Sequence, residues 1–284
     1  MSEHLVFLLL GLGAGAVYAA LGLGLVLTYR STGVVNLAHG ALAMYATYAF
    51  TELRDAAGLG SAASMVVAVG GAGLLGVAVY ALVFRPLREA PPVVGLVASV
   101  GLTVALQALA VLQFGTANRS VPALLPARPL GWGDVSVASD RVLLAALVTA
   151  AAAALWAVGR FSRVGLAARA ASQSESGAMA MGWSPDALAA GSWALAGGLG
   201  ALGGILVGPI TQLNPDTYSL LIVPALAAAS VARLSSFGVT VAVGLAIGMA
   251  QSEIVLLQDR FSALPRVGLG AGLPLVVIVF TQAL

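Results

Sequence analysis

Long apolar runs alternate with short polar intervals along the whole chain. A helix needs about 20 apolar residues to cross a bilayer, and runs near that length predict spanning helices throughout the sequence. They lie near residues 5–28, 34–50, 61–84, 92–115, 141–159, 186–207, 216–232, 237–257 and 266–283. We therefore expect an all-α polytopic membrane protein, a single transmembrane domain over residues 1–284, with eight or nine transmembrane or re-entrant helices.

Two of these runs are weak. The run 34–50 carries Asn36 and His39, and the run 216–232 is short and contains Pro224. Non-helical backbone at membrane depth is tolerated only where protein covers it or where it lines a cavity. Either run is therefore a candidate for a broken or re-entrant helix.

The longest polar interval in the second half of the chain, residues 160–185, decides the predicted orientation. It carries Arg160, Arg163 and Arg169, with only Glu175 and Asp186 nearby. Short loops rich in arginine remain on the cytoplasmic side of a membrane. The interval is therefore expected to be cytoplasmic and to contain a short helix. A subunit that drives the protein from the cytoplasm would have to contact this helix.

A second arginine cluster agrees with this orientation. Arg85 and Arg88 precede residues 160–185 by two predicted spans, so both intervals can be cytoplasmic together. Loops 51–60 and 116–140 then face outside. With nine crossings the N-terminus is outside and the C-terminus inside, whereas with eight crossings one end is reversed.

Composition excludes several classes of protein. With 60% hydrophobic residues, 8% charged residues and a mean hydropathy of +1.01, the chain is too apolar for a soluble domain, which averages about 25% charged residues. The chain has no lysine, so it lacks a Walker A loop, and ATP would have to be bound by another chain. With no cysteine and two histidines, a metal site is not expected. The net charge of +2 comes from arginines at segment ends, which indicates orientation and no nucleic-acid role.

Small residues at every fourth position predict close contacts between helices. The pattern occurs at Gly11 and Gly15, at Gly244 and Gly248, and at Gly200, Gly204 and Gly208. The apolar start MSEHLVFLLLGLG lacks a basic region, so we expect it to form the first spanning helix and not a signal peptide that is removed.

Polar residues inside the apolar runs mark the candidate substrate pathway. Asn36 and His39 either line that pathway or tie two helices together by hydrogen bonds. Ser99, Thr103 and Gln107 recur at every fourth position and form one polar stripe on an apolar helix. Hydrogen bonding to neighbouring helices is the alternative for this stripe also, but we favour a pathway lining because three polar residues on one face exceed what packing needs.

The segment Ser176–Gly177–Ala178, followed by Gly182, places small residues beside Met179 and Met181. Such a segment is typical of a short helix that lies at the membrane interface. The alternative is a surface helix that only closes a loop.

These stretches resemble the shorter permease subunit of branched-chain amino acid ABC importers. The segment YAALGLGLVLTYRSTGVVNLAHGALAMYATY, with its G-V-x-N-x-A-H-G core from Gly33 to Gly40, matches the N-terminal signature of that family, and FRPLR with the following SVGL matches a second one. Ser176, Gly177, Ala178 and Gly182 resemble the E-A-A-x-x-x-G coupling loop that docks into the ATPases. Ser176 and Gly177 replace the usual Glu and Ala, and AAASVARLSSFG, with Arg233, replaces the usual L-G-G-x-G-S region after Pro224.

The resemblance implies a permease in the cell membrane, surrounded by lipid and without a cofactor of its own. Its implied partners are a second homologous permease, two cytoplasmic ATPases that bind ATP and Mg, and an extracytoplasmic solute-binding protein. Arg169 joins the four small coupling positions as an implied ATPase contact. Relatives that carry urea, short amides or other small solutes leave the substrate open.

Three other classes of protein fit less well. A passive channel would need its own gate. An ion-coupled transporter would have only Glu253 as an intramembrane acid, and an intramembrane enzyme would lack a paired set of catalytic groups.

Overall fold

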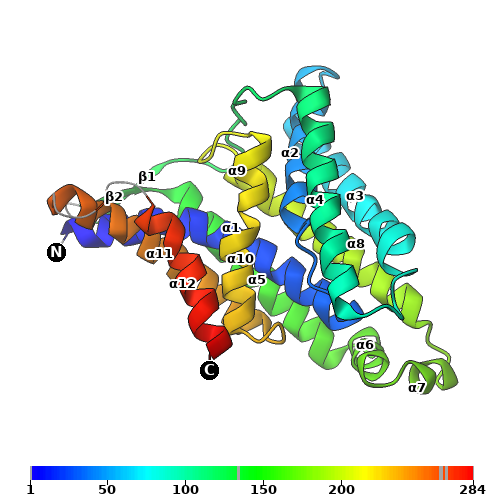
Figure 1. The fold of residues 1–284 in the computed structure, drawn as a ribbon. Helices are drawn as coiled ribbons and strands as arrows, with labels where there is room; N and C mark the ends of the chain where they lie inside the picture. The colour runs from blue at the N-terminus through cyan, green and yellow to red at the C-terminus, as the bar shows by residue number, and fades with distance from the viewer. Residues whose placement is uncertain (1, 133–134, 262–264, 266–267, 284) are drawn as a thin grey trace.

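The computed structural model describes residues 2–132, 135–261, 265 and 268–283, and it is built almost entirely of helices (Figure 1). The first half contains α1 (Ser2–Thr32), α2 (His39–Asp55), α3 (Ser61–Val79) with the π-helical turn η1 (Tyr80–Phe84), and α4 (Pro92–Phe114). The second half contains α5 (Ser139–Phe161), α6 (Arg163–Gln173), α7 (Glu175–Ala180), α8 (Pro185–Val207), α9 (Pro215–Leu220), α10 (Ile222–Val231), α11 (Phe237–Arg260) and α12 (Leu269–Ala283). An antiparallel hairpin of β1 (Pro129–Trp132) and β2 (Val135–Ala138), which the sequence did not predict, precedes α5.

Six helices of the described chain are long and apolar enough to cross a membrane. They are α1, α3 with η1, α4, α5, α8 and α11. The shorter apolar helices are α9 with α10, over Pro215–Val231, and α12. The prediction of an all-helical, polytopic membrane protein is confirmed at this level.

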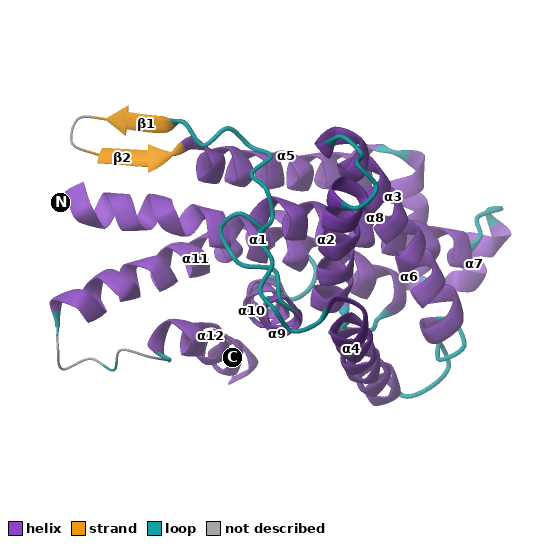
Figure 2. Ribbon diagram, turned by 90° about the horizontal axis from the view of Figure 1, so that it is seen from above, coloured by secondary structure: helices purple, strands orange, loops and turns teal. Residues whose placement is uncertain are grey.

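Helix α1 lies at the centre of the bundle and packs against α5, α8, α10 and α11 (Figures 1 and 2). Its middle part, residues 16–26, is buried on every side. A helix that is apolar all round is expected in such a position, and the sequence AVYAALGLGLV satisfies this condition.

Glycines bring α1 and α11 into backbone contact. A Cβ added to Gly11 would lie 2.4 Å from the carbonyl oxygen of Gly248, and one added to Gly15 would lie 2.8 Å from Leu245 Cα. On the opposite helix, a Cβ at Gly244 would lie 2.8 Å from Ala19 N. The two glycine pairs that the sequence marked for helix contact therefore face each other.

The two weak runs are discontinuous. Helix α2 begins only at His39, after a non-helical stretch at 33–36 and a turn at 37–38. The later run is broken at Leu221, between α9 and α10. Pro224 explains this break, because proline lacks the N–H that would bond the carbonyl four residues earlier, and its ring clashes with that carbonyl.

Ion pairs show which loops share an end of the bundle. Arg88 contacts Glu175 at 3.3 Å, so the loop after η1 and the segment 160–185 lie at one end, which we call the α7 end. Arg119 contacts Glu52 at 2.5 Å, so the end of α2 and the 116–128 loop lie together at the other end. The grouping of loops inferred from the two arginine clusters is confirmed, whereas the side of the membrane at each end stays a prediction.

Candidate functional site

Three serines begin the helices at the α7 end. The hydroxyl oxygens of Ser162, Ser174 and Ser184 accept hydrogen bonds from the backbone N–H three residues later, at the starts of α6, α7 and α8. Serine is a preferred N-cap because it satisfies one of the free donors of the first turn. The polar interval 160–185 thus folds into two short helices, α6 and α7, that project beyond the long spans (Figure 1).

Gly182 ends α7 in a left-handed conformation, with φ +81°. Its N–H bonds the carbonyl of Met179 at 2.9 Å, and the N–H of Trp183 bonds that of Ala178 at 3.0 Å. This arrangement is a Schellman motif, in which glycine is preferred because it has no Cβ. A Cβ at Gly182 would meet nothing within 4 Å, so space is not what requires glycine here. The left-handed backbone conformation explains it.

The remaining predicted coupling residues do not share one surface. Ala178 is fully buried, while Ser176 is exposed and Gly177 half-buried. Met179 on α7 and Met181 directly after it are exposed at 58% and 61%, so they, and not Ala178, are the apolar side chains open to a partner here.

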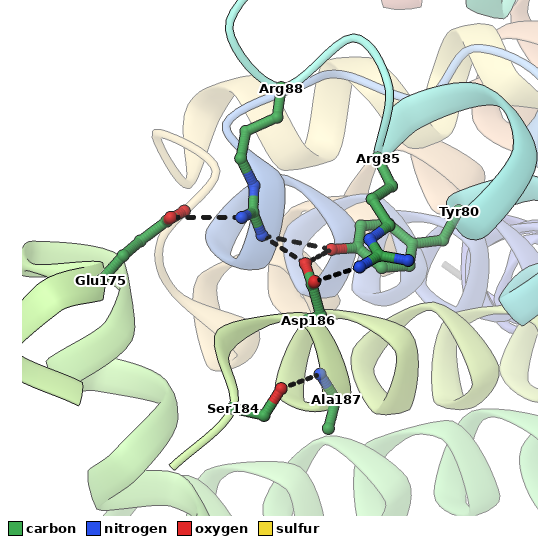
Figure 3. A network of polar contacts seen from close by, with 7 residues as sticks. All are labelled: Tyr80, Arg85, Arg88, Glu175, Ser184, Asp186 and Ala187. Carbon is green, nitrogen blue, oxygen red and sulfur yellow. Dashed lines mark hydrogen bonds and ion pairs between the residues drawn. The ribbon is translucent and has the colours of Figure 1, made fainter. Parts of the chain in front are cut away.

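A polar network joins the loop after η1 to the first turn of α8 (Figure 3). Asp186 accepts a hydrogen bond from the Tyr80 hydroxyl at 2.9 Å and pairs with Arg88 Nη2 at 2.6 Å and Arg85 Nη2 at 2.9 Å. Arg88 also pairs with Glu175 on α7. One carboxylate therefore ties α8 to η1 and to the arginine loop, and Arg88 adds α7 to the same cluster.

Both carboxylates of this network sit in the first turn of a helix, where the positive end of the dipole favours them. Burial lowers the pKa of Arg88, but Glu175, Asp186 and Tyr80 outweigh it and raise the pKa above its ordinary value. Arg88 thus remains charged. Arg88 belongs to the FRPLR signature in the sequence, whereas the sequence does not predict the roles of Tyr80 and Asp186. Residues near helix ends give no periodic signal of their partners.

A cavity of about 570 Å³ opens beside this network. It lies between the end of α1, the loop after η1, the start of α4, the end of α6 and the α10–α11 turn. Arg30, Arg88 and Arg233 line it, together with Glu175. Arg233 and Leu234 both have left-handed backbone, with φ +49° and +51°, which is uncommon for residues other than glycine.

Asn36 and His39 are buried at the start of α2. The Asn36 side-chain oxygen accepts a hydrogen bond from Ala38 N–H at 3.1 Å, which forms the turn into the helix. Asn36 Nδ2 and His39 Nε2 are buried without a hydrogen-bond partner within the described chain. The His39 ring lies between Gly24 on α1 and Gly200 on α8, in space that side chains at these positions would occupy. A Cβ added to Gly24 would lie 2.0 Å from His39 Nε2, and one added to Gly200 would lie 3.1 Å from it.

The two discontinuous helices meet beside His39. A Cβ at Gly40 would lie 2.8 Å from the carbonyl oxygen of Ser219 and 3.2 Å from that of Tyr218, directly before the break at Leu221. The Tyr218 hydroxyl in turn donates to the carbonyl oxygen of Gly204 on α8, at 3.1 Å. The start of α2, the α9–α10 break and the middle of α8 therefore form one cluster.

The polar stripe on α4 bonds mainly to its own helix. Ser99 is buried and donates to the carbonyl oxygen of Leu96 at 2.7 Å, and Thr103 donates to that of Ser99 at 2.9 Å. Gln107 is half-buried. Helix α4 packs against α2 and α9, so the stripe belongs to the same side of the bundle as Asn36 and His39. None of the five predicted pathway residues lines the 570 Å³ cavity.

Two glycines of α8 lie against α2, and Gly208, directly after α8, lies against the 116–128 loop. An added Cβ would meet the His39 ring at Gly200, Ala43 O and Thr47 Oγ1 on α2 at Gly204, and Val121 of the 116–128 loop at Gly208. Glu253, the only acid considered for ion coupling, contacts His4 near the N-terminus of α1. It therefore lies toward the end opposite α7.

Comparisons with known proteins agree along almost the whole chain. Residues 7–280 match the family described as branched-chain amino acid transport system, permease component. The chain is 25% identical over 269 residues to the high-affinity branched-chain amino acid transport system permease protein LivH of Escherichia coli, covering 89% of this chain and 87% of that protein. It is 25% identical to the corresponding permease protein BraD of Pseudomonas aeruginosa, with 88% and 86% covered, and 27% identical to the probable permease LivH of Methanocaldococcus jannaschii, with 82% and 76% covered. No solved structure matches the chain.

Proposed function

Because the chain belongs to the branched-chain amino acid transport permease family, we propose that it is the translocating subunit of an ATP-binding cassette importer for branched-chain amino acids. It is a multi-pass membrane permease with six candidate spans, from a family of permease subunits and not of ATPases. A second permease, two ATPases that bind ATP and Mg, and an extracytoplasmic binding protein complete the proposed complex.

The proposed topology has nine crossings. Helices α2, α9 with α10, and α12 add three passes to the six long spans, with the N-terminus outside and the C-terminus inside. The α7 end, with its arginines, is then cytoplasmic by the loop-charge rule.

The network around Asp186 is the observation that carries the coupling proposal. Helix α7 presents Met179 and Met181 outward for an ATPase, and Glu175 at its start holds Arg88. Arg88 in turn holds Asp186 in the first turn of α8. A displacement of α7 is thereby passed to α8 through charge-assisted contacts, which are about twice as strong as neutral hydrogen bonds.

The proposed substrate pathway runs past the cluster where α2 begins and the α9–α10 segment breaks. Transporters commonly bind substrate where discontinuous helices meet near the bilayer midplane, with a helix N-terminus directed at an anionic group of the substrate. Here Asn36 Nδ2 is an unpartnered donor beside the start of α2, and an amino acid carries a carboxylate that such a donor binds. His39, packed between Gly24 and Gly200, would hold the start of α2 in place beside the pathway. Ser99, Thr103 and Gln107 on α4 would line the adjoining part of the pathway.

Reconstitution in proteoliposomes tests this function. The assembled complex should take up labelled leucine only when ATP and the binding protein are both present, whereas this chain alone should hydrolyse no ATP. Uptake without ATP would support a passive channel instead. ATP-dependent uptake of urea or a short amide in place of leucine would retain the importer and change its substrate.

A further inference from the structure

We propose that a groove at the α7 end binds an anionic phospholipid, with Arg30 and Arg169 holding the phosphate and the apolar walls holding an acyl chain. The groove runs between the end of α1, the α5–α6 corner and the start of α8. In the orientation proposed above, this lipid belongs to the cytoplasmic leaflet.

Among the described residues, the two arginines have no carboxylate partner. Arg30 and Arg169 both line the groove, and neither belongs to an ion pair within 4.0 Å among the described residues. Glu175, which also lines the groove, is bound to Arg88. Arg169 Nε is buried without a hydrogen-bond partner in the described chain, and an unsatisfied buried donor is costly. A phosphate between the two guanidinium groups would supply the missing acceptor and relieve their repulsion.

The rest of the groove is apolar and opens where lipid would be. Leu27, Leu155 and Leu188 line it, and Val158 and Leu195, exposed at 52% and 54%, form its lipid-facing part. These residues come from membrane-spanning helices, and Leu195, ten residues after the start of α8, lies about 15 Å from that start, which is the depth of acyl chains. Arg88 also lines the groove, but its charge is paired with Glu175 and Asp186. The combination of an apolar channel with the other two cations at one end is complementary to a phospholipid and exceeds what a free phosphate needs.

The position of the groove also fits a headgroup. Trp156 and Phe161, at the end of α5, are exposed and pack edge to face with ring centroids 5.6 Å apart. Exposed aromatic residues gather at membrane interfaces. Helix α6 buries Gly165 and Ala167 and exposes Val164 beside Arg163, as an interfacial amphipathic helix does. Arg169, on this helix, is therefore at headgroup depth.

Native mass spectrometry of the purified, assembled complex tests the proposal. Phosphatidylglycerol should be retained in preference to phosphatidylcholine. The double change Arg30→Gln and Arg169→Gln should weaken its binding by about tenfold or more, because it removes the charge-assisted hydrogen bonds to the phosphate. Arg163→Gln is the control: it removes one positive charge from the exposed face of α6, outside the groove, and should leave the binding unchanged.

A second pair of variants tests the acyl-chain part. Gly159 lines the groove and a Cβ there would meet nothing within 4 Å, so the side chain of Gly159→Leu has room to enter the groove and should fill it. This variant should lose phosphatidylglycerol, whereas Gly101→Leu, equally open but on α4, should retain it.

Three outcomes would overturn the proposal. Equal retention of the two lipids would remove the charge selectivity, and unchanged binding by the double arginine variant would remove the site. Displacement of the lipid by inorganic phosphate at the same concentration would show a free-anion site. All three are measured without transport, so they are independent of whether the complex imports an amino acid.

Discussion

Gly24→Ala should destabilise the protein because the new methyl group would enter the space of the His39 ring. The added Cβ would lie 2.0 Å from His39 Nε2 and 2.6 Å from Cε1, far inside van der Waals contact. His39 cannot move away freely, since it is 1% exposed and Gly200 closes the other side of the ring. Overpacking a buried site costs about 1–3 kcal/mol, and the absence of free space places this change at the upper end.

The thermal unfolding midpoint of the purified complex, with the yield of assembled complex, measures this effect. A loss of about 3 kcal/mol should lower the midpoint by roughly 5–10 °C. Gly70→Ala is the control, because a Cβ at Gly70 on α3 would meet nothing within 4 Å.

A double variant separates this clash from a loss of helix flexibility. In Gly24→Ala with His39→Ala, the methyl group would enter the space left by the ring, so the two changes together should cost less than their sum, by about 0.5–3 kcal/mol. Equal midpoints for Gly24→Ala and Gly70→Ala, or strictly additive effects in the double variant, would refute the packing of His39 between α1 and α8.

Three further predictions concern the α7 end. Gly182→Ala should lower stability by about 1–2 kcal/mol because of its left-handed backbone, and Gly182→Asn, which tolerates that conformation, should cost less; equal unfolding midpoints for the two variants would contradict the backbone explanation. Since the chain has no cysteine, cysteines introduced at Ser174 and Ser120 should react with an impermeant thiol reagent from opposite sides, Ser174 only from the cytoplasm; labelling of Ser174 in intact cells would reverse the proposed orientation. Asp186→Asn should weaken the polar network by about 1–2 kcal/mol, a modest figure because its arginine partners are partly exposed, and should reduce uptake severalfold while ATP hydrolysis continues; an unchanged ratio of uptake to hydrolysis would remove the coupling role.

Periodicity and composition predicted the parts of the fold that depend on one helix at a time. The apolar runs located the long spans, Pro224 indicated the broken run, and the arginine clusters grouped the loops at each end. The glycine pattern went one step further, because Gly11 and Gly15 do face Gly244 and Gly248. A small-residue stripe needs another close backbone, and two such stripes of similar spacing satisfy each other.

The contacts between distant helices could not be read in this way. Nothing in the sequence near His39 specifies that its ring fits between Gly24 and Gly200, since the pattern of one helix gives its apolar face but not the neighbour that covers it. In the sequence, Asp186 is only one of two acidic residues beside an arginine-rich loop. In the structure it accepts contacts from Tyr80, Arg85 and Arg88. The sequence marks Arg233 as a departure from the family pattern but does not predict the turn at Arg233 and Leu234, because left-handed backbone is usually marked by glycine.

Helix α8 joins all parts of the proposed mechanism. Its first turn carries Asp186, and further along Trp193 packs on the Phe84 ring with centroids 4.6 Å apart. In its middle part, Gly200 adjoins His39, and the carbonyl oxygen of Gly204 accepts a hydrogen bond from the Tyr218 hydroxyl. Gly208, directly after its last turn, adjoins the 116–128 loop at the opposite end. With 23 residues at 1.5 Å each, the helix is about 35 Å long. Because its glycines bring neighbouring backbones into contact, few flexible side chains remain between the helices to absorb a displacement. We therefore expect a movement of the first turn of α8 to shift the start of α2 and the α9–α10 break together, which places the proposed pathway directly under the control of the α7 end.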